Sequence, residues 1–325
     1  MIKRLRFYIS NCHDPYINLA QEKYLLDTTE PDFCTLYLWQ NQNTVVIGKN
    51  QNALAECRVE LLNQEGGKLA RRLSGGGAVF HDLGNLNFTF LCLTDNLDIG
   101  KQMSVIKEAC RLAGIHSELS GRNDILSDSR KFSGNAFYNG GGKSYHHGTI
   151  LISADTEKMQ RYLSPPKAKL EAKGVKSVKS RVLNLAEISP NLTCEAMKAY
   201  LLSAFEAIYG MPADEITELD EAKISHLADK YSSWDYIYGT PLPFNISLQE
   251  HFSFGNVELQ MQVNEGIVKD VKVYTDALDA SLSEMIRLAL ISLPLKLNTI
   301  SNSLFNCLPH DIAQCIISLI EKQIF

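Results

Sequence analysis

Apolar residues recur at helical spacing in three stretches of the first two-thirds of the chain, at residues 18–27, 102–113 and 193–209. Glycine directly follows the second and third stretches, at Gly114 and Gly210. A glycine free to adopt positive φ commonly ends a helix. The spacing therefore predicts three helices, each with one apolar face that packs into a hydrophobic core.

A second pattern, of short and largely apolar runs, predicts strands at residues 35–39, 44–48, 87–91 and 147–152. The polar residues 40–43 separate the first two runs, so we read these two as a hairpin. Charged and apolar residues alternate over positions 1–7, as is typical of an edge strand. Because strands outnumber alternations of strand and helix, we expect an α+β fold in which a mostly antiparallel sheet is flanked by helices.

Two prolines and a glycine interrupt the periodicity at residues 239–245, as in a linker between domains. After this segment the pattern predicts two strands and two helices, at residues 254–263, 267–274, 282–293 and 310–323. A chain of 325 residues exceeds the size at which one hydrophobic core is usual. We therefore predict a larger domain at residues 1–244 and a small α+β domain at residues 245–325.

Composition and charge exclude several classes of protein. The chain is 45% hydrophobic and 21% charged, with a formal net charge of −5, which argues against a surface built to bind nucleic acid. The eight cysteines show no paired spacing, so we expect free thiols in a reducing compartment. Neither a signal peptide nor a membrane-length apolar run is evident. We expect a cytoplasmic protein with neither nucleic acid nor membrane as a partner.

A glycine-rich segment at residues 71–85 carries the most specific chemistry of the chain. It reads Arg-Arg-Leu-Ser-Gly-Gly-Gly-Ala-Val-Phe-His-Asp-Leu-Gly-Asn. Two cations followed by three residues without side chains place backbone N–H groups beside something anionic and compact, as in a nucleotide or acyl-adenylate site. A glycine-rich bend in a hairpin is the better interpretation of three lone glycines, but the full string is more specific than its glycines.

A second cluster comprises Asn123-Asp124, the segment 130–136 and the segment 145–149. Lys131 is followed closely by Ser133 and Gly134, so a ligand can approach it, and a lysine is well suited to charge that accumulates on phosphate oxygens. The alternative is an exposed lysine paired with Asp124 or Asp128. Asp124 could hold a magnesium ion, or could only cap or pair locally.

Adjacent histidines and a second run of glycines complete this region. His146 and His147 lie next to each other in a predicted strand, so their side chains point to opposite faces and cannot both bind one metal comfortably. The run at 140–144 ends in Gly-Lys-Ser but lacks the earlier glycine of a P-loop, where Phe137 stands. We interpret it as a flexible turn whose Lys143 reaches the cleft.

A basic segment at residues 165–181 carries six cations and one carboxylate. A solvated basic face is the usual meaning of such a run. Nucleic-acid binding is disfavoured because no aromatic residue is interleaved for base stacking. A mobile lid over a polyanion, or a landing surface for an acidic protein partner, fits the glycine among the lysines better.

Taken in order, these segments resemble the lipoate–protein ligase family. The resemblance covers most of the first 185 residues, and the tail is similar to the small accessory domain of the bacterial ligases. It implies that residues 1–244 form a catalytic domain. The implied fold is the catalytic core that this family shares with biotin ligases and class II tRNA synthetases. The simple expectation for the oligomeric state is a monomer.

The resemblance implies a two-step reaction. Lipoate and ATP give lipoyl-AMP and pyrophosphate, and a lysine of the acceptor then takes the lipoyl group. The implied acceptors are apo lipoyl domains of 2-oxoacid dehydrogenase E2 subunits and the glycine-cleavage H protein. The resemblance assigns the nucleotide to Arg72 and the backbone of Gly77, Ala78, Val79 and Phe80. The substrate is assigned to Ser74, Gly76 and His147, and Asp124 is the candidate ligand of Mg²⁺. Lys131 would bridge the lipoate carboxylate and the phosphate.

One position departs from the family pattern: Phe137-Tyr138 stands where some members carry an arginine, and Lys143 could replace that cation. Trp39 and residues 45–47 could line a tunnel for the lipoate tail. An ATP-independent octanoyl or lipoyl transferase would need a nucleophilic cysteine, and none lies between Cys110 and Cys194, although Cys57 or Cys92 could approach the site if the fold brings them there. A biotin ligase is a further alternative, but the glycine-rich loop resembles the lipoate type. A non-catalytic lipoate-binding protein would keep the pocket and have no need for Lys131.

Overall fold

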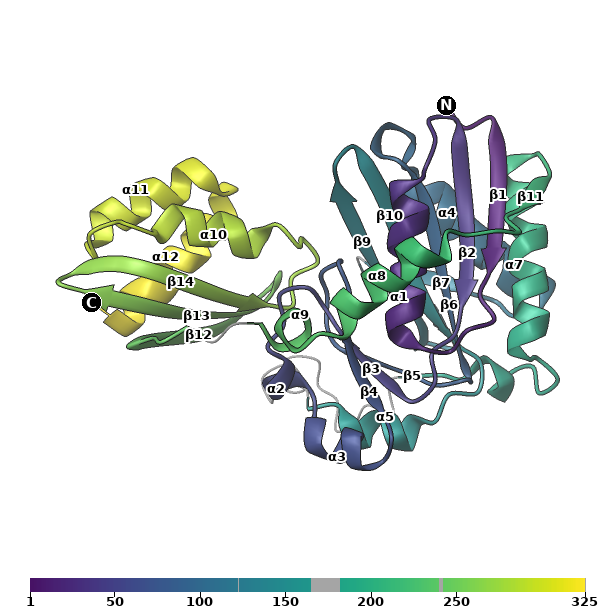
Figure 1. The fold of residues 1–325 in the computed structure, drawn as a ribbon, viewed down its shortest axis with the longest axis horizontal. Helices are drawn as coiled ribbons and strands as arrows, with labels where there is room; N and C mark the ends of the chain where they lie inside the picture. The colour runs from purple at the N-terminus through teal and green to yellow at the C-terminus, as the bar shows by residue number, and fades with distance from the viewer. Residues whose placement is uncertain (122, 165–181, 240–241, 325) are drawn as a thin grey trace.

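A computed structural model describes residues 1–121, 123–164, 182–239 and 242–324. Within these residues the larger part of the molecule is built on an eight-stranded sheet of order β11-β1-β2-β6-β10-β9-β8-β7 (Figure 1). In chain order these strands are β1 (Arg4–Ile9), β2 (Phe33–Trp39), β6 (Asn85–Leu93), β7 (Glu118–Ser120), β8 (Asp124–Ser127), β9 (Arg130–Gly140), β10 (Lys143–Leu151) and β11 (Ala213–Glu215). Neighbours from β2 to β7 pair antiparallel, which confirms a mostly antiparallel sheet.

The first strand does not lie at the edge of the sheet, so this prediction was wrong. β1 pairs in parallel with β2 on one side and with β11 on the other. β11 has only three residues, Ala-Asp-Glu, and no apolar alternation. A strand that short and polar leaves no sequence signal, and it covers the edge that β1 would otherwise expose.

The predicted hairpin of residues 35–48 was also wrong. β3 (Thr44–Ile47) does not pair with β2 but lies between β4 (Lys68–Arg71) and β5 (Val79–His81) in a separate three-stranded sheet. Asn43, at φ 43°, turns the chain out of the central sheet. Every residue of β2 and β3 is buried, so neither strand shows an alternation that would indicate its partner.

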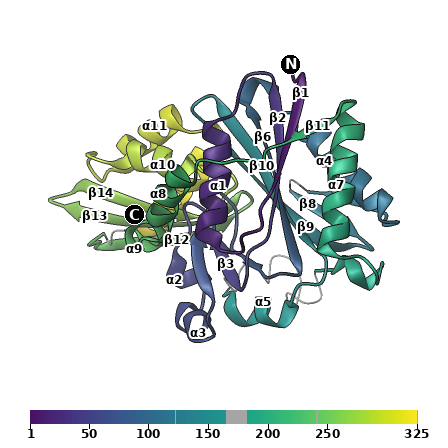
Figure 2. The ribbon, with the colours of Figure 1, turned by 45° about the vertical axis from the view of Figure 1, so that its right-hand side comes forward.

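Two layers of helices cover the central sheet, one on each face (Figure 2). One face packs against α1 (Pro15–Asp27) and α8 (Glu221–Ser232), and the other against α4 (Ile99–Leu112) and α7 (Cys194–Tyr209). Three of these four were predicted from spacing. The Thr193 hydroxyl caps α7 by accepting from the Ala196 N–H, and Gly210 ends it at φ 74°.

Short helices connect these layers at the end of the sheet that bears the small sheet. They are α2 (Ala53–Glu56), α3 (Val59–Gln64), α5 (Thr156–Tyr162), the 3₁₀ turn η2 (Leu185–Glu187) and α9 (Trp234–Tyr238). The 3₁₀ turn η1 (Thr94–Asn96) lies at the other end of β6, where the Thr94 N–H donates to the Gly142 carbonyl. No helix in the described part of the chain is both long and apolar enough to cross a bilayer.

A smaller C-terminal domain has its own sheet and its own hydrophobic core. Its antiparallel strands β12 (Ile246–Phe252), β13 (Gly255–Asn264) and β14 (Ile267–Thr275) pack against α10 (Leu282–Leu290), α11 (Leu297–Cys307) and α12 (His310–Ile324). The sequence pattern predicted β13, β14, α10 and α12 but not β12 or α11. The α11 sequence is rich in Asn, Ser and Thr, which favour turns over helices, so packing rather than propensity stabilises it.

The two domains meet at the glycine-rich segment. The Gly76 N–H donates to the Ala277 carbonyl at 3.0 Å, and the Thr275 N–H donates to the Asn50 carbonyl at 2.9 Å. The Asn50 side chain also donates to the Ala280 carbonyl at 2.9 Å. The segment after β14 therefore lies directly on the loop that the sequence singled out.

Candidate functional site

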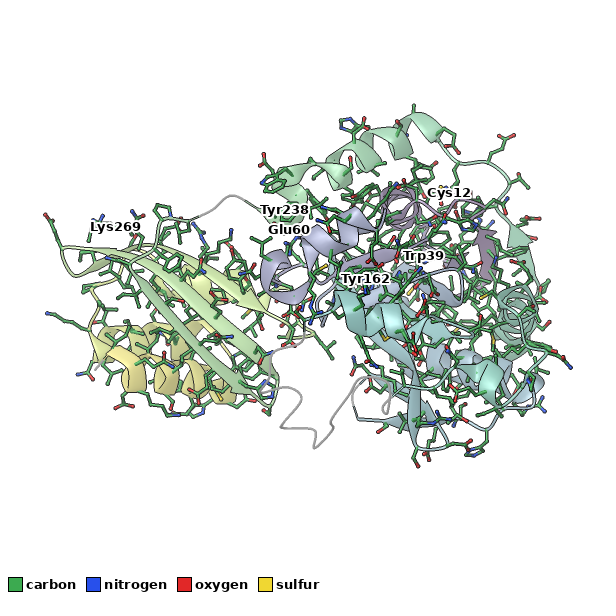
Figure 3. The ribbon with its side chains drawn as sticks, turned by 90° about the horizontal axis from the view of Figure 1, so that it is seen from below. Cys12, Trp39, Glu60, Tyr162, Tyr238 and Lys269 are labelled. Atoms are coloured by element: carbon green, nitrogen blue, oxygen red, sulfur yellow. The ribbon has the colours of Figure 1, made fainter. Side chains whose placement is uncertain are left out.

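A cavity of about 600 Å³ lies where the central sheet, the small sheet and the C-terminal domain meet. Leu19, Trp39 and Val46 form an apolar end, and Trp39 lies deep in the larger domain (Figure 3). Asp124 and Lys131 stand on the polar side. The C-terminal domain contributes residues 251–255 together with Asp276 and Leu278. The cavity thus combines an apolar compartment with a charged one.

Nearly all of the residues that the sequence selected line this cavity. They are Arg72, Gly76, Gly77, Ala78, Val79, Phe80, Asp124, Lys131 and His147. Ser74 is fully buried behind the wall, where its hydroxyl contacts His147. For the suggested tail pocket, Trp39 and Val46 line the cavity, whereas Val45 and Ile47 point into a core on the other side of β3.

The glycines of the loop allow close approach of backbone to backbone. A Cβ on Gly48 would collide with the Gly76 carbonyl, and a Cβ on Gly75 would collide with the Ala277 carbonyl. Gly76 itself has φ 88°, a conformation that a side chain disfavours. The loop is therefore pressed between β3 and the C-terminal domain, with the backbone of residues 77–80 left along the cavity wall.

Both arginines of the motif hold the backbone around the loop. The Arg71 guanidinium donates to five carbonyls, those of Gly48, Lys49, Gln51, Tyr236 and Ile237. The Arg72 guanidinium donates to the carbonyls of Val46, Gly75 and Gly77. Burial lowers the pKa of Arg72 to about 10. The pair therefore fixes the loop, and Arg72 does so at the wall of the cavity.

His147 lies in a buried series of polar groups. Its Nδ1 donates to Glu22 Oε1 at 2.9 Å, and its Nε2 lies 2.8 Å from Ser74 Oγ. Glu22 Oε1 also accepts from Thr89 Oγ1 at 2.8 Å, and Thr89 in turn accepts from Trp39 Nε1 at 3.1 Å. Glu22 was not among the residues predicted from sequence. Its position could have indicated a role, because Glu22 follows Ala20 and Gln21 on the buried face of α1 and a buried carboxylate needs a partner.

Lys131 and Asp124 form an ion pair within the cavity wall. Lys131 Nζ lies 2.6 Å from Asp124 Oδ1, and the two side chains are 32% and 25% exposed. A Cβ on Gly134 would approach Lys131 Nζ to 2.8 Å, so the glycine leaves room for the lysine. The pairing with Asp124 that the sequence offered as an alternative is confirmed, and it places the cation at the cavity.

The two adjacent histidines point to opposite faces of the sheet, as predicted. His147 contacts Glu22 of α1, whereas His146 contacts Gln102 of α4. Among the described residues, no group of three or more His, Cys, Asp or Glu side chains is placed to hold a metal ion. Asp124 therefore offers a single carboxylate, which suits a Mg²⁺ ion that arrives bound to phosphates, because such sites usually use one or two carboxylates.

Lys143 does not reach the cleft, so that prediction was wrong. The turn of Gly141 and Gly142, at φ 62° and 75°, forms as expected, but the Lys143 ammonium donates to the Asp27 carbonyl away from the cavity. The chain reverses direction at this turn, at the end of β9 and β10 remote from Gly148 and Gly134. The basic segment predicted as a lid, residues 165–181, lies outside the described residues.

All eight cysteines are free thiols, and within the part of the chain that the structure describes none of them lines the cavity. Cys57 and Cys92 are buried in hydrophobic cores. Burial raises the pKa of Cys57 to about 12 and that of Cys92 to about 11, so neither side chain is a thiolate near neutral pH. The described cavity thus offers lysine and carboxylate chemistry rather than thiol chemistry.

Family models match most of the chain. The lipoyl protein ligase A/B catalytic domain matches residues 14–206, and the bacterial lipoate protein ligase C-terminus matches residues 242–321. Among curated proteins, lipoate-protein ligase A of Psychrobacter cryohalolentis is 38% identical over 294 residues, which cover 87% of each chain.

Solved structures give the same result. LipL1 of P. falciparum in complex with lipoate has a TM-score of 0.86 at 29% identity, covering 97% of this chain and 99% of that one. A lipoate-protein ligase A bound with ATP has a TM-score of 0.63 at 25% identity, covering 74% and 99%. A bi-partite ligase studied with its E2 lipoyl domain, from Thermoplasma acidophilum, has a TM-score of 0.64 at 26% identity, covering 76% and 100%. The chain therefore belongs to the lipoate-protein ligase A family and is a ligase.

Proposed function

We propose that this ligase joins free lipoate to a protein lysine by way of lipoyl-AMP. In the first step ATP and lipoate give lipoyl-AMP and pyrophosphate, and in the second the lipoyl group passes to an acceptor lysine. The acceptors would be apo lipoyl domains of 2-oxoacid dehydrogenase E2 subunits and the glycine-cleavage H protein. The lipoate complex, the ATP complex and the ligase paired with its lipoyl domain among the structural relatives support this proposal.

One observation carries the proposal: a single cavity joins an apolar compartment to Lys131 and to the backbone of residues 77–80. An acyl chain with a terminal carboxylate needs an apolar slot and a cation at its end. Leu19, Trp39 and Val46 supply the slot, and Lys131 supplies the cation. The glycine-rich loop beside it suits the phosphates of a nucleotide, because exposed backbone N–H groups bind anions.

In the first step a lipoate carboxylate oxygen attacks the α-phosphorus, the bond from that phosphorus to the bridging oxygen breaks, and pyrophosphate leaves. Negative charge grows on the phosphate oxygens during this displacement. Lys131 would bridge the carboxylate and the α-phosphate, and Arg72 with the backbone of residues 77–80 would hold the nucleotide. Ser74, Gly76 and His147 would position the acyl end. Cations and N–H groups that are fixed in advance lower the barrier.

A Mg²⁺ ion would be held by Asp124 together with phosphate oxygens. When bound there it supplies positive charge to the leaving pyrophosphate. Asp124 already lies 2.6 Å from Lys131, so the carboxylate would orient the lysine as well as the metal. Residues 1–244 would carry out this chemistry, with residues 245–325 as an accessory domain that closes the cavity and the monomer as the working unit.

In the second step the acceptor lysine amine attacks the acyl carbon of the mixed anhydride, AMP leaves, and the amine loses a proton. The decisive experiment incubates the protein with ATP, magnesium, free lipoate and an apo lipoyl domain, and weighs the domain by mass spectrometry. We expect a mass increase of one lipoyl group that disappears when ATP is omitted. Modification without ATP would indicate a transferase, and no modification in either sample would indicate a binding protein.

A further inference from the structure

His146 is a fully buried histidine to which the proposed reaction assigns no role. The rings of Phe88, Phe90 and Phe137 surround it, with centroids 5.5, 5.8 and 5.0 Å away. Its two nitrogens meet polar groups: Nε2 lies 2.8 Å from Asn135 Oδ1, and Nδ1 lies 3.1 Å from the side-chain amide of Gln102. A ring held in this way has one fixed orientation.

The hydrogen bonds around His146 determine which nitrogen carries its proton. Asn135 donates from Nδ2 to the Asn123 carbonyl at 3.0 Å, so its Oδ1 must face His146. An oxygen there requires His146 Nε2 to donate. Burial lowers the pKa of His146 to about 3, so the ring is neutral and Nδ1 must accept. The Gln102 atom placed at 3.1 Å from Nδ1 is Oε1, so an accepting Nδ1 requires the Gln102 amide to be turned by 180°. That turn would also give a partner to Gln102 Nε2, a buried nitrogen with no hydrogen bond among the described residues.

Asn135 carries this constraint to the loop before β8. Besides the side-chain bond, the Asn135 N–H donates to the Asn123 carbonyl at 2.9 Å, and Asn123 Nδ2 donates back to the Asn135 carbonyl at 2.9 Å. Gly148 makes room for the asparagine, since a Cβ there would lie 2.8 Å from Asn135 Oδ1. The next residue in the chain after Asn123 is Asp124, whose carboxylate holds Lys131 at 2.6 Å.

We propose that His146 is a positioning residue for Lys131, acting through Asn135 and the Asn123-Asp124 backbone. The inference rests on the proposed function, because it concerns the lysine that would bridge carboxylate and phosphate. His146 lies on the face of the sheet opposite His147, Glu22 and the apolar end of the cavity. Its loss should therefore affect the chemical step and not the binding of the acyl chain.

Two variants separate positioning from packing. His146→Phe keeps an aromatic ring in the aromatic site but removes the donor, whereas His146→Gln keeps an N–H near the position of Nε2. For His146→Phe we expect kcat for pyrophosphate release from ATP and lipoate to fall by between about 10-fold and 100-fold, since a displacement of about 1 Å has that effect. The KM for lipoate should change by less than about twofold. His146→Gln should recover most of the lost rate.

The free energy of unfolding of both variants, measured by urea titration, gives the folded fraction used to correct kcat. A folded His146→Phe enzyme with the parental kcat would overturn the proposal, and so would an equal loss of kcat in both variants. A ¹⁵N spectrum of histidine-labelled protein, with His146→Gln to identify the signals, should show a protonated Nε2 and a bare Nδ1 at neutral pH. The other tautomer would overturn it as well. If the parent enzyme released no pyrophosphate, the proposed function would be wrong. The spectrum would still test the hydrogen bonds of His146 independently of that result.

Discussion

Two opposite charges, on Glu22 and Arg72, lie in the buried part of the site and are connected through Ser74 and His147. Arg72 Nε donates to Ser74 Oγ at 3.0 Å, and His147 Nδ1 donates to Glu22 at 2.9 Å, with 2.8 Å between Ser74 and His147. Burying one charge alone is costly, so each group at this wall depends on the next. Lys131 differs because it is partly exposed and forms an ion pair with Asp124.

Lys131→Ala should therefore leave a folded protein that cannot form lipoyl-AMP. Truncating a partly exposed lysine costs little stability, whereas losing the cation beside the phosphate should reduce pyrophosphate release by about 100-fold or more. Lys143→Ala is the matched control, because Lys143 also lies near the start of a long strand of the central sheet but donates to the Asp27 carbonyl away from the cavity. Parental pyrophosphate release by folded Lys131→Ala would remove the lysine from the mechanism.

Stability should fall in mild acid because two histidines are buried uncharged. Burial, with smaller contributions from Arg72 and His147, lowers the pKa of His81 to about 3, and burial with a smaller contribution from His147 lowers the pKa of His146 to about 3. Between their unfolded value of about 6.5 and about 3, the unfolded chain binds protons that the folded chain does not. The free energy of unfolding should thus decrease as pH falls, by up to about 1.4 kcal/mol per pH unit for each histidine.

Urea unfolding at pH 7, 6 and 5 measures this dependence. His146→Gln removes one of the two titrating groups, so its stability should decline less steeply than that of the parent protein over the same range. Parallel curves for the two proteins would show that His146 takes up its proton in the folded state as readily as in the unfolded chain.

The sequence was a good guide to residues that share a linear motif and a poor one to their supports. Lys131, Asp124 and His147 stand in short strings whose residue types indicate phosphate chemistry, and all three line the cavity. Glu22 and Gln102 lie on helices, with no motif around them. Their roles depend on which strand each helix packs against, and hydrophobic spacing carries no information about that partner.

At the scale of elements, the strands β9 and β10 bring the candidate residues together. Their antiparallel register places Asn135 opposite Gly148 and Ala136 opposite His147. Gly148 has no side chain at the point where Phe88 and Asn135 converge. β9 and β10 can therefore pair in this register, with polar groups on both faces, only because Gly148 has no side chain.

Gly148→Ala should destabilise the protein and slow pyrophosphate release. The added Cβ would lie 2.6 Å from Phe88 Cζ and 2.8 Å from Asn135 Oδ1, and overpacking of this kind costs about 1–3 kcal/mol. Gly100→Ala is a suitable control, since the nearest atom lies at 3.5 Å and alanine favours the helix by up to about 1 kcal/mol. Thermal unfolding and pyrophosphate release test both variants, and a Gly148→Ala protein as stable as the parent would contradict the expected collision.

Element prediction failed where burial or polarity removed the pattern. β2 and β3 are apolar on both faces, so a strand that leaves for a second sheet looks the same in sequence as the second strand of a hairpin. β11 and α11 failed for the opposite reason, since each is polar and forms only because tertiary neighbours pair or pack with it. Helices with one apolar face, such as α4 and α7, were found because only one side of each is buried.

At the scale of the whole molecule, the cavity is shared by two domains with separate cores. The C-terminal domain lines it with Phe252, Phe254 and Leu278, and its segment 275–280 binds the glycine-rich loop and Asn50 through backbone and amide hydrogen bonds. A small number of hydrogen bonds does not hold two domains firmly together unless their backbones also fit closely. At this interface the fit depends on Gly75.

Gly75→Ala should therefore push the domains apart without unfolding either of them. The added Cβ would collide with the Ala277 carbonyl and lie 2.5 Å from the Leu278 carbonyl, both of which are backbone atoms that cannot rotate away. We expect the closed arrangement to lose about 1–3 kcal/mol. Small-angle scattering should then give a larger radius of gyration, while circular dichroism stays unchanged.

Asn50→Ala provides the graded comparison for this experiment, since it removes one hydrogen bond to the Ala280 carbonyl without adding any atom to the interface. It should weaken the contact by about 1 kcal/mol and enlarge the molecule less than Gly75→Ala does. If Gly75→Ala scattered like the parent protein, the loop would have to relax within the larger domain. The glycine would then serve the shape of the loop and not the contact between the domains.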